Sequence, residues 1–315
     1  MDRRSLIKSL GLGAVLSGLP GAGLLRAAAA AAPSKAARKR VLRFAHLTDV
    51  HLEPEMNAPK GLAACLHHIQ SQKEQPSFIM NTGDCIMDAL KQPKDRVETQ
   101  WNLWHGLMKS DNSLPIEYCI GNHDCWGAGQ TGDALYGKKY ALEMMHLPKP
   151  YRSFDKAGWH FIVLDSIQTL PDGAWYTCFL DEEQYAWLQA DLEANTTKPI
   201  IIFSHVPIVS AAAVVTDNKF KPGQGFVLGQ GTMHADAPRL IELFDKHPNV
   251  KVCMSGHIHL YEQIQYNNVT YISNGACSGN WWKGVRSHTE NGYAMVNLYD
   301  DGTFDNEYIP YGWNV

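Results

Sequence analysis

Short apolar runs alternate with amphipathic segments along most of this 315-residue chain. The runs that are typical of buried strands are 41–48, 77–81, 116–120, 159–164, 199–203 and 250–254. The segments with the apolar spacing of helices are 61–75, 97–108 and 181–193. Strands that alternate with helices in this way predict a mainly parallel sheet with helices on its faces. The sequence is therefore expected to fold as an α/β protein.

The pattern changes after residue 259. Four further runs read as strands, at 263–266, 270–273, 293–299 and 303–308. The dipeptides Asn267-Asn268 and Asp301-Gly302 are typical of the tight turns that join antiparallel neighbours. A glycine-rich, mostly uncharged loop is expected at 206–237. We find no internal repeat.

Composition excludes some classes of protein. With 45% hydrophobic residues, the chain can bury one large core. The formal net charge is −4, and removing the first 33 residues leaves 24 basic and 31 acidic side chains. A protein that binds nucleic acid normally carries a basic patch or stripe, so neither nucleic acid nor anionic lipid is an expected partner.

The N-terminus is typical of an export signal. Arg3 and Arg4 precede an apolar, glycine-containing run, and small residues suitable for cleavage follow up to Ala32. The double arginine resembles a twin-arginine signal, although Asp2 stands where Ser or Thr is usual. A membrane anchor is the alternative, against which the glycines and Pro20 argue.

This interpretation divides the chain into three parts. Residues 1–33 form the signal, 34–40 a basic linker, and 41–315 a single domain. We expect the Tat export machinery as a partner in transit, no stable membrane anchor, and a periplasmic or secreted mature protein.

Seven cysteines are too few and too scattered for a disulfide framework in a chain of this length. No pair has the C-x-x-C spacing of a structural zinc site. We expect most of them to be small core residues, with room for one bridge in an oxidising compartment.

Five of the predicted strands end in groups that can bind a metal. These groups are Asp49 with His51, Asp84, the run Asn122-His123-Asp124, His205, and His257 with His259. The carboxyl ends of strands in an open α/β sheet form a crevice where ligands bind. For the run that begins at Gly121, the simpler interpretation is a solvated Asn/Asp turn with a chance histidine. The other four groups favour a shared site.

Spacing indicates how these groups could converge. Asp49 and His51 lie two apart on a segment expected to be extended, so both side chains can point the same way, and the same holds for His257 and His259. Gly83 and Gly121 would let the backbone bend and approach closely. Mixed imidazole, carboxylate and amide ligands suit Zn, Mn or Fe better than Ca or Mg. Two such ions sharing one carboxylate are the usual device for phosphoester hydrolysis.

The ordered motifs Asp49-Val50-His51, Gly83-Asp84, Gly121-Asn122-His123-Asp124, His205 and Gly256-His257-Ile258-His259 resemble those of the calcineurin-like metallophosphoesterases. The resemblance covers residues 41 to about 259. It implies a four-layer α/β/β/α sandwich of two packed mixed sheets, with the metal site at the strand ends. It also implies two divalent or trivalent transition-metal ions, Fe, Mn or Zn.

The resemblance assigns a role to each residue. The first metal would be held by Asp49, His51, Asp84 and His259. The second would be held by Asp84, Asn122, His205 and His257. His123 would protonate or stabilise the leaving oxygen, and Asp124 would hold His123 in its working tautomer. A hydroxide between the metals would attack phosphorus in line.

Comparison with groups within the family indicates which of them this chain resembles more. Purple acid phosphatases place a tyrosine ligand where this chain has Met87. The bacterial cyclic-nucleotide phosphodiesterases are more similar in length and in having Asp88 after the bridging residue. The segment 274–284 is similar to one found in exported relatives of unsettled substrate.

Several residues outside these motifs could also take part in the site. Trp281 and Trp282 could stack a flat leaving group or pack at the core or rim. Lys283 and Arg286 could pair with a second phosphate or be solvated. Asp165 is interpreted as a supporting or turn residue, and Trp101 with Trp104 as core. His234 follows His205 on a loop that could cover the site.

The sequence thus predicts a dinuclear phosphoesterase that acts on a small phosphoester. A diester, of the cyclic-nucleotide or glycerophosphodiester type, is preferred because few cations are expected near the site to neutralise a dianion. A phosphomonoesterase or a phosphoprotein phosphatase with the same site is the alternative. A binding protein that has lost the chemistry is the more remote one.

Overall fold

The computed structural model describes residues 38–170, 172–216 and 220–313, all of which belong to one compact unit. The predicted signal, residues 1–33, and most of the predicted linker, 34–40, lie outside the described residues. Within the described part of the chain, no helix combines the length and apolar character that a membrane span requires.

The first sheet has five strands. Their order is β15 (Phe304–Pro310), β14 (Gly292–Tyr299), β1 (Arg40–Leu47), β2 (Ile79–Asn81) and β3 (Ile116–Tyr118). The last three are parallel, whereas β14 runs antiparallel to both of its neighbours. The helices that follow β1, β2 and β3 are α1 (Ala58–Gln70), α2 (Lys94–Asp111) and α3 (Lys138–Met144).

The second sheet has six strands. Their order is β12 (Glu262–Tyr266), β13 (Val269–Ser273), β11 (Val250–Ser255), β8 (Ile200–Phe203), β5 (Trp159–Val163) and β4 (Arg152–Lys156). The four central strands are parallel, and the two edge strands are antiparallel to their neighbours. Two helices accompany this sheet, α4 (Glu182–Ala194) and α6 (Ala237–Asp245).

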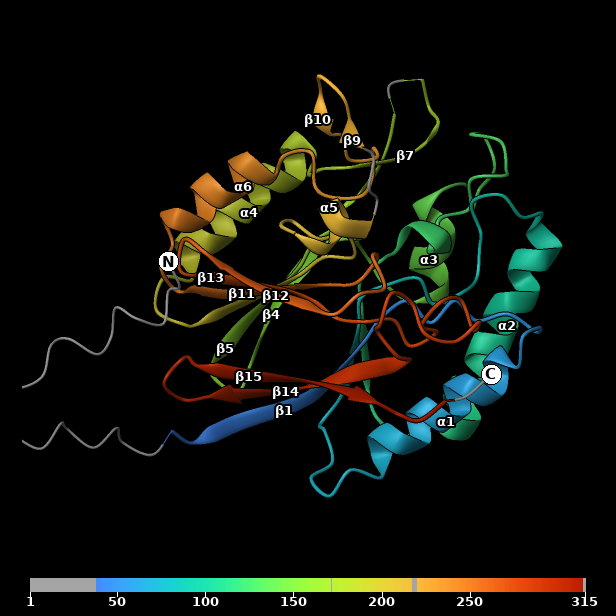
Figure 1. Ribbon diagram of the computed structural model, residues 1–315, viewed down its shortest axis with the longest axis horizontal. Helices are drawn as coiled ribbons and strands as arrows, with labels where there is room; N and C mark the ends of the chain where they lie inside the picture. The colour runs from blue at the N-terminus through green and yellow to red at the C-terminus, as the bar shows by residue number, and fades with distance from the viewer. Residues whose placement is uncertain (1–37, 171, 217–219, 314–315) are drawn as a thin grey trace, which may run out of the picture. The chain divides into compact units, whose positions relative to one another are not determined.

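Three apolar clusters hold these elements in four layers. The middle cluster joins the sheets, because it combines Phe44 and Met80 of the first with Phe161 and Phe203 of the second. A second cluster packs α1 and α2 on the outer face of the first sheet, and a third packs α4 and α6 on the second. Figure 1 shows the two helix pairs on opposite sides of the sheets. The predicted α/β/β/α sandwich is therefore the observed fold.

Asp181 caps α4 by accepting from the backbone N–H of Gln184 at 2.8 Å. Two predictions about the core are confirmed. Trp101 and Trp104 are both buried in the core under α2. All seven cysteines are buried and unpaired.

Several elements were not predicted. They are α3, β4, α6, the hairpin of β6 (Ile167–Thr169) and β7 (Trp175–Cys178), and, inside the expected 206–237 loop, α5 (Ala212–Thr216), β9 (Phe220–Lys221) and β10 (Gly225–Phe226). All are short, so they span too few turns or alternations for periodicity to stand out. The β6–β7 hairpin matters most, because it lies beside the site described next.

Candidate metal centre

The seven predicted metal ligands come from loops that follow five strands. Asp49 and His51 follow β1, Asp84 follows β2, Asn122 follows β3, His205 follows β8, and His257 with His259 follows β11. Both sheets thus contribute their C-terminal strand ends to one place. All of these side chains except that of His257 belong to fully buried residues, with exposures of 2% or less.

The backbone at this place is strained. Five of the seven residues have left-handed φ angles, between 48° and 70°, which non-glycine residues rarely adopt: Asp49, His51, Asp84, His257 and His259. The expectation of extended segments at 49–51 and 257–259 was therefore wrong, although both pairs still face one site. Strain of this kind costs about 1–3 kcal/mol per residue and is concentrated at functional sites.

Close approach between the loops requires two glycines, as predicted. Gly83 has φ +102°, and a Cβ on it would lie 2.4 Å from the backbone nitrogen of Gly121. A Cβ on Gly121 would in turn lie 2.2 Å from Oδ1 of Asp84. Any larger side chain at either position would push Asp84 out of place.

One group of side chains converges around the first predicted metal. His51 Nε2 and His259 Nε2 are 2.9 Å apart. Asp49 Oδ1 lies 3.4 Å from His259 Nε2, and Asp84 Oδ2 lies 3.6 Å from His51 Nε2. Asp49 Oδ1 has no hydrogen-bond partner although it is buried.

A second group converges on the other side of Asp84. His205 Nε2 lies 3.2 Å from Asp84 Oδ2 and 3.0 Å from Asn122 Oδ1. His257 Nδ1 lies 3.2 Å from His205 Nε2. The same carboxylate oxygen, Oδ2 of Asp84, therefore faces an imidazole of each group. This is the position that the sequence assigned to a bridging ligand.

The tautomers of two histidines show that these groups suit cations. His259 donates from Nδ1 to the carbonyl of Gly279 at 2.7 Å, and His205 donates from Nδ1 to the carbonyl of Thr82 at 2.8 Å. In the neutral imidazole each Nε2 then carries a lone pair, which points at other acceptors. A cation between these atoms would satisfy all of them, and such outer hydrogen bonds are how proteins orient metal-binding histidines.

Electrostatics in the metal-free protein agree with this fit. Burial lowers the pKa of His205, but the Asp84 carboxylate outweighs it and raises the pKa to about 9. Burial and the neighbouring His205 lower the pKa of His257 to about 3. Burial would raise the pKa of Asp84, yet nearby imidazoles hold it well below its usual range. The carboxylate is thus ionised and available to a cation.

The segment 274–284, which we call the supporting segment, holds the first group from behind. Ser278 Oγ donates to the carbonyl of Asp49 at 2.8 Å, and the indole Nε1 of Trp282 donates to the carbonyl of His51 at 2.9 Å. Gly279 supplies the carbonyl that orients His259. Of the two interpretations of Trp282, core packing is confirmed, since this side chain is fully buried.

The acidic partner of His123 differs from the one expected. The carboxylate nearest to His123 Nδ1 is that of Asp88, at 3.6 Å. Asp124 instead accepts from the backbone N–H groups of Asp84, Cys85 and Gly121, at 2.8–2.9 Å. Burial and the Asp84 charge raise the pKa of Asp124 to about 7. Asp124 thus braces the loop of Asp84. Asp88 faces Nδ1 of His123 from beyond hydrogen-bond distance, and this nitrogen has no hydrogen-bond partner among the described residues.

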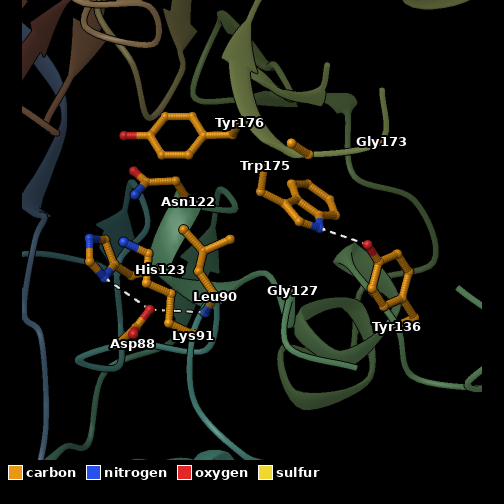
Figure 2. A pocket seen from close by; sticks show the side chains of 11 residues that line it. Asp88, Leu90, Lys91, Asn122, His123, Gly127, Tyr136, Gly173, Trp175 and Tyr176 are labelled. Atoms are coloured by element: carbon orange, nitrogen blue, oxygen red, sulfur yellow. Dashed lines mark hydrogen bonds and ion pairs between the residues drawn. The ribbon is translucent and has the colours of Figure 1, made fainter. Parts of the chain in front are cut away.

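A cavity of about 470 Å³ opens beside His123 and Asn122. Figure 2 shows Asp88 and Lys91 on the His123 side of this cavity, and Trp175 with Tyr136 on its far side. Sequence reasoning missed Lys91, Trp175 and Tyr176, because no local motif connects them with the predicted ligands. The aromatic pair in an otherwise polar segment, 172–177, was the available signal.

Of the other residues that the sequence singled out, two lie beside the candidate metal centre and two form structural contacts. Trp281 lies over His259, with ring centroids 4.5 Å apart, and the guanidinium of Arg286 lies 4.6 Å from the Trp281 centroid. Arg286 is half-buried, not solvated as the simpler interpretation had it. Asp165 forms an ion pair with Lys138 at 2.5 Å, in keeping with a supporting role. His234 is buried and bonded to Asp236.

Comparison with known proteins identifies the family. The family model for calcineurin-like phosphoesterases matches residues 42–261. A 3′,5′-cyclic-nucleotide phosphodiesterase of Nostoc sp. is 26% identical over 291 residues, which cover 87% of this chain and 94% of that protein. Purple acid phosphatase 22 of Arabidopsis thaliana is 32% identical over 227 residues, 68% of this chain and 45% of that protein.

A solved structure shows the same fold. The dimetal phosphatase from Danio rerio superimposes with a TM-score of 0.62 at 13% sequence identity, covering 87% of this chain and all of that one. The family match spans well over half of the sequence. The chain is therefore a member of the calcineurin-like phosphoesterase family, and a hydrolytic enzyme.

Proposed function

We propose that this protein hydrolyses phosphodiesters with two transition-metal ions. The observation that carries the proposal is the position of Asp84, whose Oδ2 lies 3.6 Å from an imidazole of one group and 3.2 Å from an imidazole of the other. Asp49, His51 and His259 would complete the first metal site. Asn122, His205 and His257 would complete the second. Fe, Mn and Zn suit this mixture of nitrogen and oxygen ligands.

Metal ions in such a site lower the pKa of water and polarise a phosphoryl oxygen. The protein itself supplies the proton for the leaving group. His123 lies beside the ligands, since its ring centroid is 4.8 Å from that of His51. Asp88 faces Nδ1 of His123, so it would hold that nitrogen protonated and leave the other one to serve the leaving oxygen.

The diester preference has support from the relatives. Proteins from Nostoc sp. and from Escherichia coli that are similar over most of their length carry the name of cyclic-nucleotide phosphodiesterases. The substrate would then be a cyclic nucleotide or a glycerophosphodiester.

A phosphomonoesterase is the second candidate, and one observation favours it. Neither Lys91 nor Arg286 has an ion-pair partner among the described residues. The sequence argument for a diester assumed few cations near the site. Two unpaired cations could together neutralise the second charge of a monoester.

The test is turnover of matched esters by mature protein that has been reconstituted with Mn, Fe or Zn. We expect bis(p-nitrophenyl) phosphate to be hydrolysed faster than p-nitrophenyl phosphate, and two metal ions to be bound per chain. Asp84→Asn should lose both metal and turnover. Faster hydrolysis of the monoester would favour the second candidate, and full turnover by the metal-free protein would refute the metal mechanism.

We also propose that residues 1–33 direct export by the twin-arginine route and are then removed, leaving 34–40 as a linker before the domain. The support is the sequence pattern of Arg3, Arg4 and the apolar run after them. Replacing both arginines by lysine should retain the protein in the cytoplasm. Processed protein in the periplasmic fraction of that variant would contradict the proposal.

A further inference from the structure

The cavity beside His123 raises the question of which part of the substrate enters it. We propose that it receives the leaving group, and that Trp175 selects leaving groups that carry a flat ring of nucleoside size. This inference rests on the proposed function and deepens it by naming the substrate class. The residues that carry it are His123, Asp88, Lys91, Trp175, Tyr136 and Tyr176.

His123 decides which part of the substrate faces the cavity. It lines the cavity, yet its ring also lies against His51 of the candidate metal centre. An imidazole that gives a proton to the leaving oxygen must lie within hydrogen-bond reach of it. The leaving oxygen, and the group attached to it, would therefore lie on the cavity side.

The cavity differs in character from one end to the other. Asp88, Lys91 and Asn122 lie near His123, whereas Trp175 and Tyr136 lie at the opposite end (Figure 2). A fitting ligand is polar where it joins phosphorus and flat and apolar farther out. The volume of about 470 Å³ is within the range of pockets for small molecules. A nucleoside has this distribution of polarity and is a small molecule of the kind that such pockets bind.

Trp175 is held in place before any ligand arrives. Its indole Nε1 donates to the hydroxyl of Tyr136 at 3.2 Å. Two glycines leave room for the ring: a Cβ on Gly127 would lie 2.8 Å from Trp175 Cδ1, and one on Gly137 would lie 2.9 Å from Cζ2. Because the side chain is already ordered, stacking a ring on it costs little further entropy.

Tyr176 extends the aromatic surface toward the metal centre. Its ring lies 6.1 Å from that of His257, edge to face, and packs so closely on Gly231 that a Cβ there would lie 2.8 Å from Cε2. A ring-bearing leaving group would thus meet aromatic side chains along the length of the cavity. A glycerol-type leaving group has no flat face and would leave Trp175 without a partner, so it should gain little from this wall.

The first experiment compares two diesters on metal-loaded protein: adenosine 3′,5′-cyclic phosphate and glycerophosphoethanolamine. Trp175→Leu keeps apolar volume and removes the ring. We expect kcat/KM for the cyclic nucleotide to fall by about tenfold, the usual scale of one stacked base, with little change for the glycerol ester. Trp175→Phe should restore most of the loss. Trp187→Ala is the control, because Trp187 lies on α4, packs against Tyr151 and does not line the cavity.

The second experiment measures binding and does not require turnover. Adenosine is titrated into the metal-free protein and followed by saturation-transfer NMR. Saturable binding that Trp175→Leu abolishes and Trp187→Ala retains supports the inference, even if no ester is turned over, in which case only the proposed function fails. Equal losses on both diesters, or unchanged adenosine binding by Trp175→Leu, would overturn the inference. Thermal unfolding of each variant verifies that it is folded.

Discussion

The supporting segment and the β6–β7 hairpin flank the same centre, but they contact it in different ways. The supporting segment forms hydrogen bonds with the backbone of Asp49 and His51 and with the ring of His259. The hydrogen bonds described for hairpin residues 167–170 and 172–178 stay within the hairpin or reach neighbours such as Tyr136, Lys138 and Gly231. One region is thus built to fix metal ligands, and the other to shape a cavity.

This contrast indicates which property of the enzyme depends on each region. Changes in the supporting segment should alter stability and metal retention for every substrate. Changes in the hairpin should alter the choice of substrate and leave the metals in place. The Trp175 variants test the hairpin. Four further positions, in order of expected effect, test the supporting segment, the His123 end of the cavity, the Trp281 side of the centre and a place far from both regions.

The largest effect is expected at Trp282. Trp282→Ala removes a fully buried ring that packs so tightly over α1 that a Cβ on Gly61 would lie 2.2 Å from it. Truncating a buried Trp costs about 3–5 kcal/mol of unfolding free energy. The loss of the bond to the His51 carbonyl should in addition weaken metal binding. Urea unfolding of the metal-free protein and metal analysis after dialysis measure the two effects separately.

Trp159 provides the control. It is equally buried and also donates from Nε1 to a backbone carbonyl, that of Tyr299, at 2.9 Å. It lies between the sheets, in the middle cluster. Trp159→Ala should destabilise the protein to a similar degree without a specific loss of metal affinity. If both variants lost metal equally, the supporting segment would have no special role at the centre.

Which parts of this arrangement the sequence could predict follows from how local each signal is. Asp49, Asp84, His205 and the other ligands each follow a buried strand, so strand periodicity alone placed them at one end of a sheet. The contact between Trp282 and His51 joins residues 231 positions apart, and no spacing within the segment announces it. The same holds for Trp175, whose ring packs against Gly127 and Gly137, 48 and 38 positions before it in the sequence.

The partner of His123 illustrates a second limit. Asp124 is adjacent to His123 in sequence, whereas Asp88, whose carboxylate faces His123 Nδ1, is not, so proximity along the chain could not indicate Asp88. The 3₁₀ turn at Asn122–Asp124 directs the Asp124 side chain back to the amides of residues 84, 85 and 121. The local sequence pattern identified which residue types lie together, but it could not predict the direction of a side chain within a tight turn.

The next largest effect is expected at Asp88, which lines the cavity but acts on His123. Asp88→Asn should slow hydrolysis of an alkyl diester by about 10²-fold, the lower end of general acid–base contributions. The effect on bis(p-nitrophenyl) phosphate should be much smaller, because p-nitrophenolate leaves without a proton. Metal content should stay at the wild-type level. His123→Ala should show the same dependence on leaving group.

Asp124→Asn separates the two carboxylates. It weakens a brace for three backbone amides, so it should lower the unfolding temperature and slow all esters alike. A leaving-group dependence in Asp124→Asn, or none in Asp88→Asn, would restore the original assignment.

A smaller effect is expected at Arg286, on the supporting side. Its guanidinium is half-buried on Trp281, where burial lowers its pKa while the charge of Asp49 opposes that change. Arg286→Gln should raise the inhibition constant for inorganic phosphate about threefold, which is the scale of a partly exposed charge. Arg239, which pairs with Glu182 on the outer helices, is the matched control. Equal changes in both variants would mean that only net charge matters.

The smallest effect is expected far from both regions, at His160. This residue is the second of β5, at the end opposite the site, and its two ring nitrogens each lie 2.8 Å from a carboxylate, of Asp155 and of Asp191. Burial lowers the pKa of His160, but the two carboxylates outweigh burial and raise it above its ordinary value. His160 therefore binds a proton more tightly in the folded state than in the unfolded state. That stabilisation is complete below the unfolded-state pKa and is lost as the pH rises through the folded-state pKa.

His160→Gln should consequently lower the unfolding free energy by about 1 kcal/mol or less at mildly acidic pH, and by a smaller amount at alkaline pH. Thermal unfolding of both proteins across this range measures the difference. Metal content and the ratio of cyclic-nucleotide to glycerol-ester turnover should not change, since none of the hydrogen bonds described for the supporting segment or the hairpin involves His160 or its two carboxylate partners. A shifted ratio would show that the sheet transmits changes between its ends, and substrate choice could then no longer be attributed to the hairpin alone.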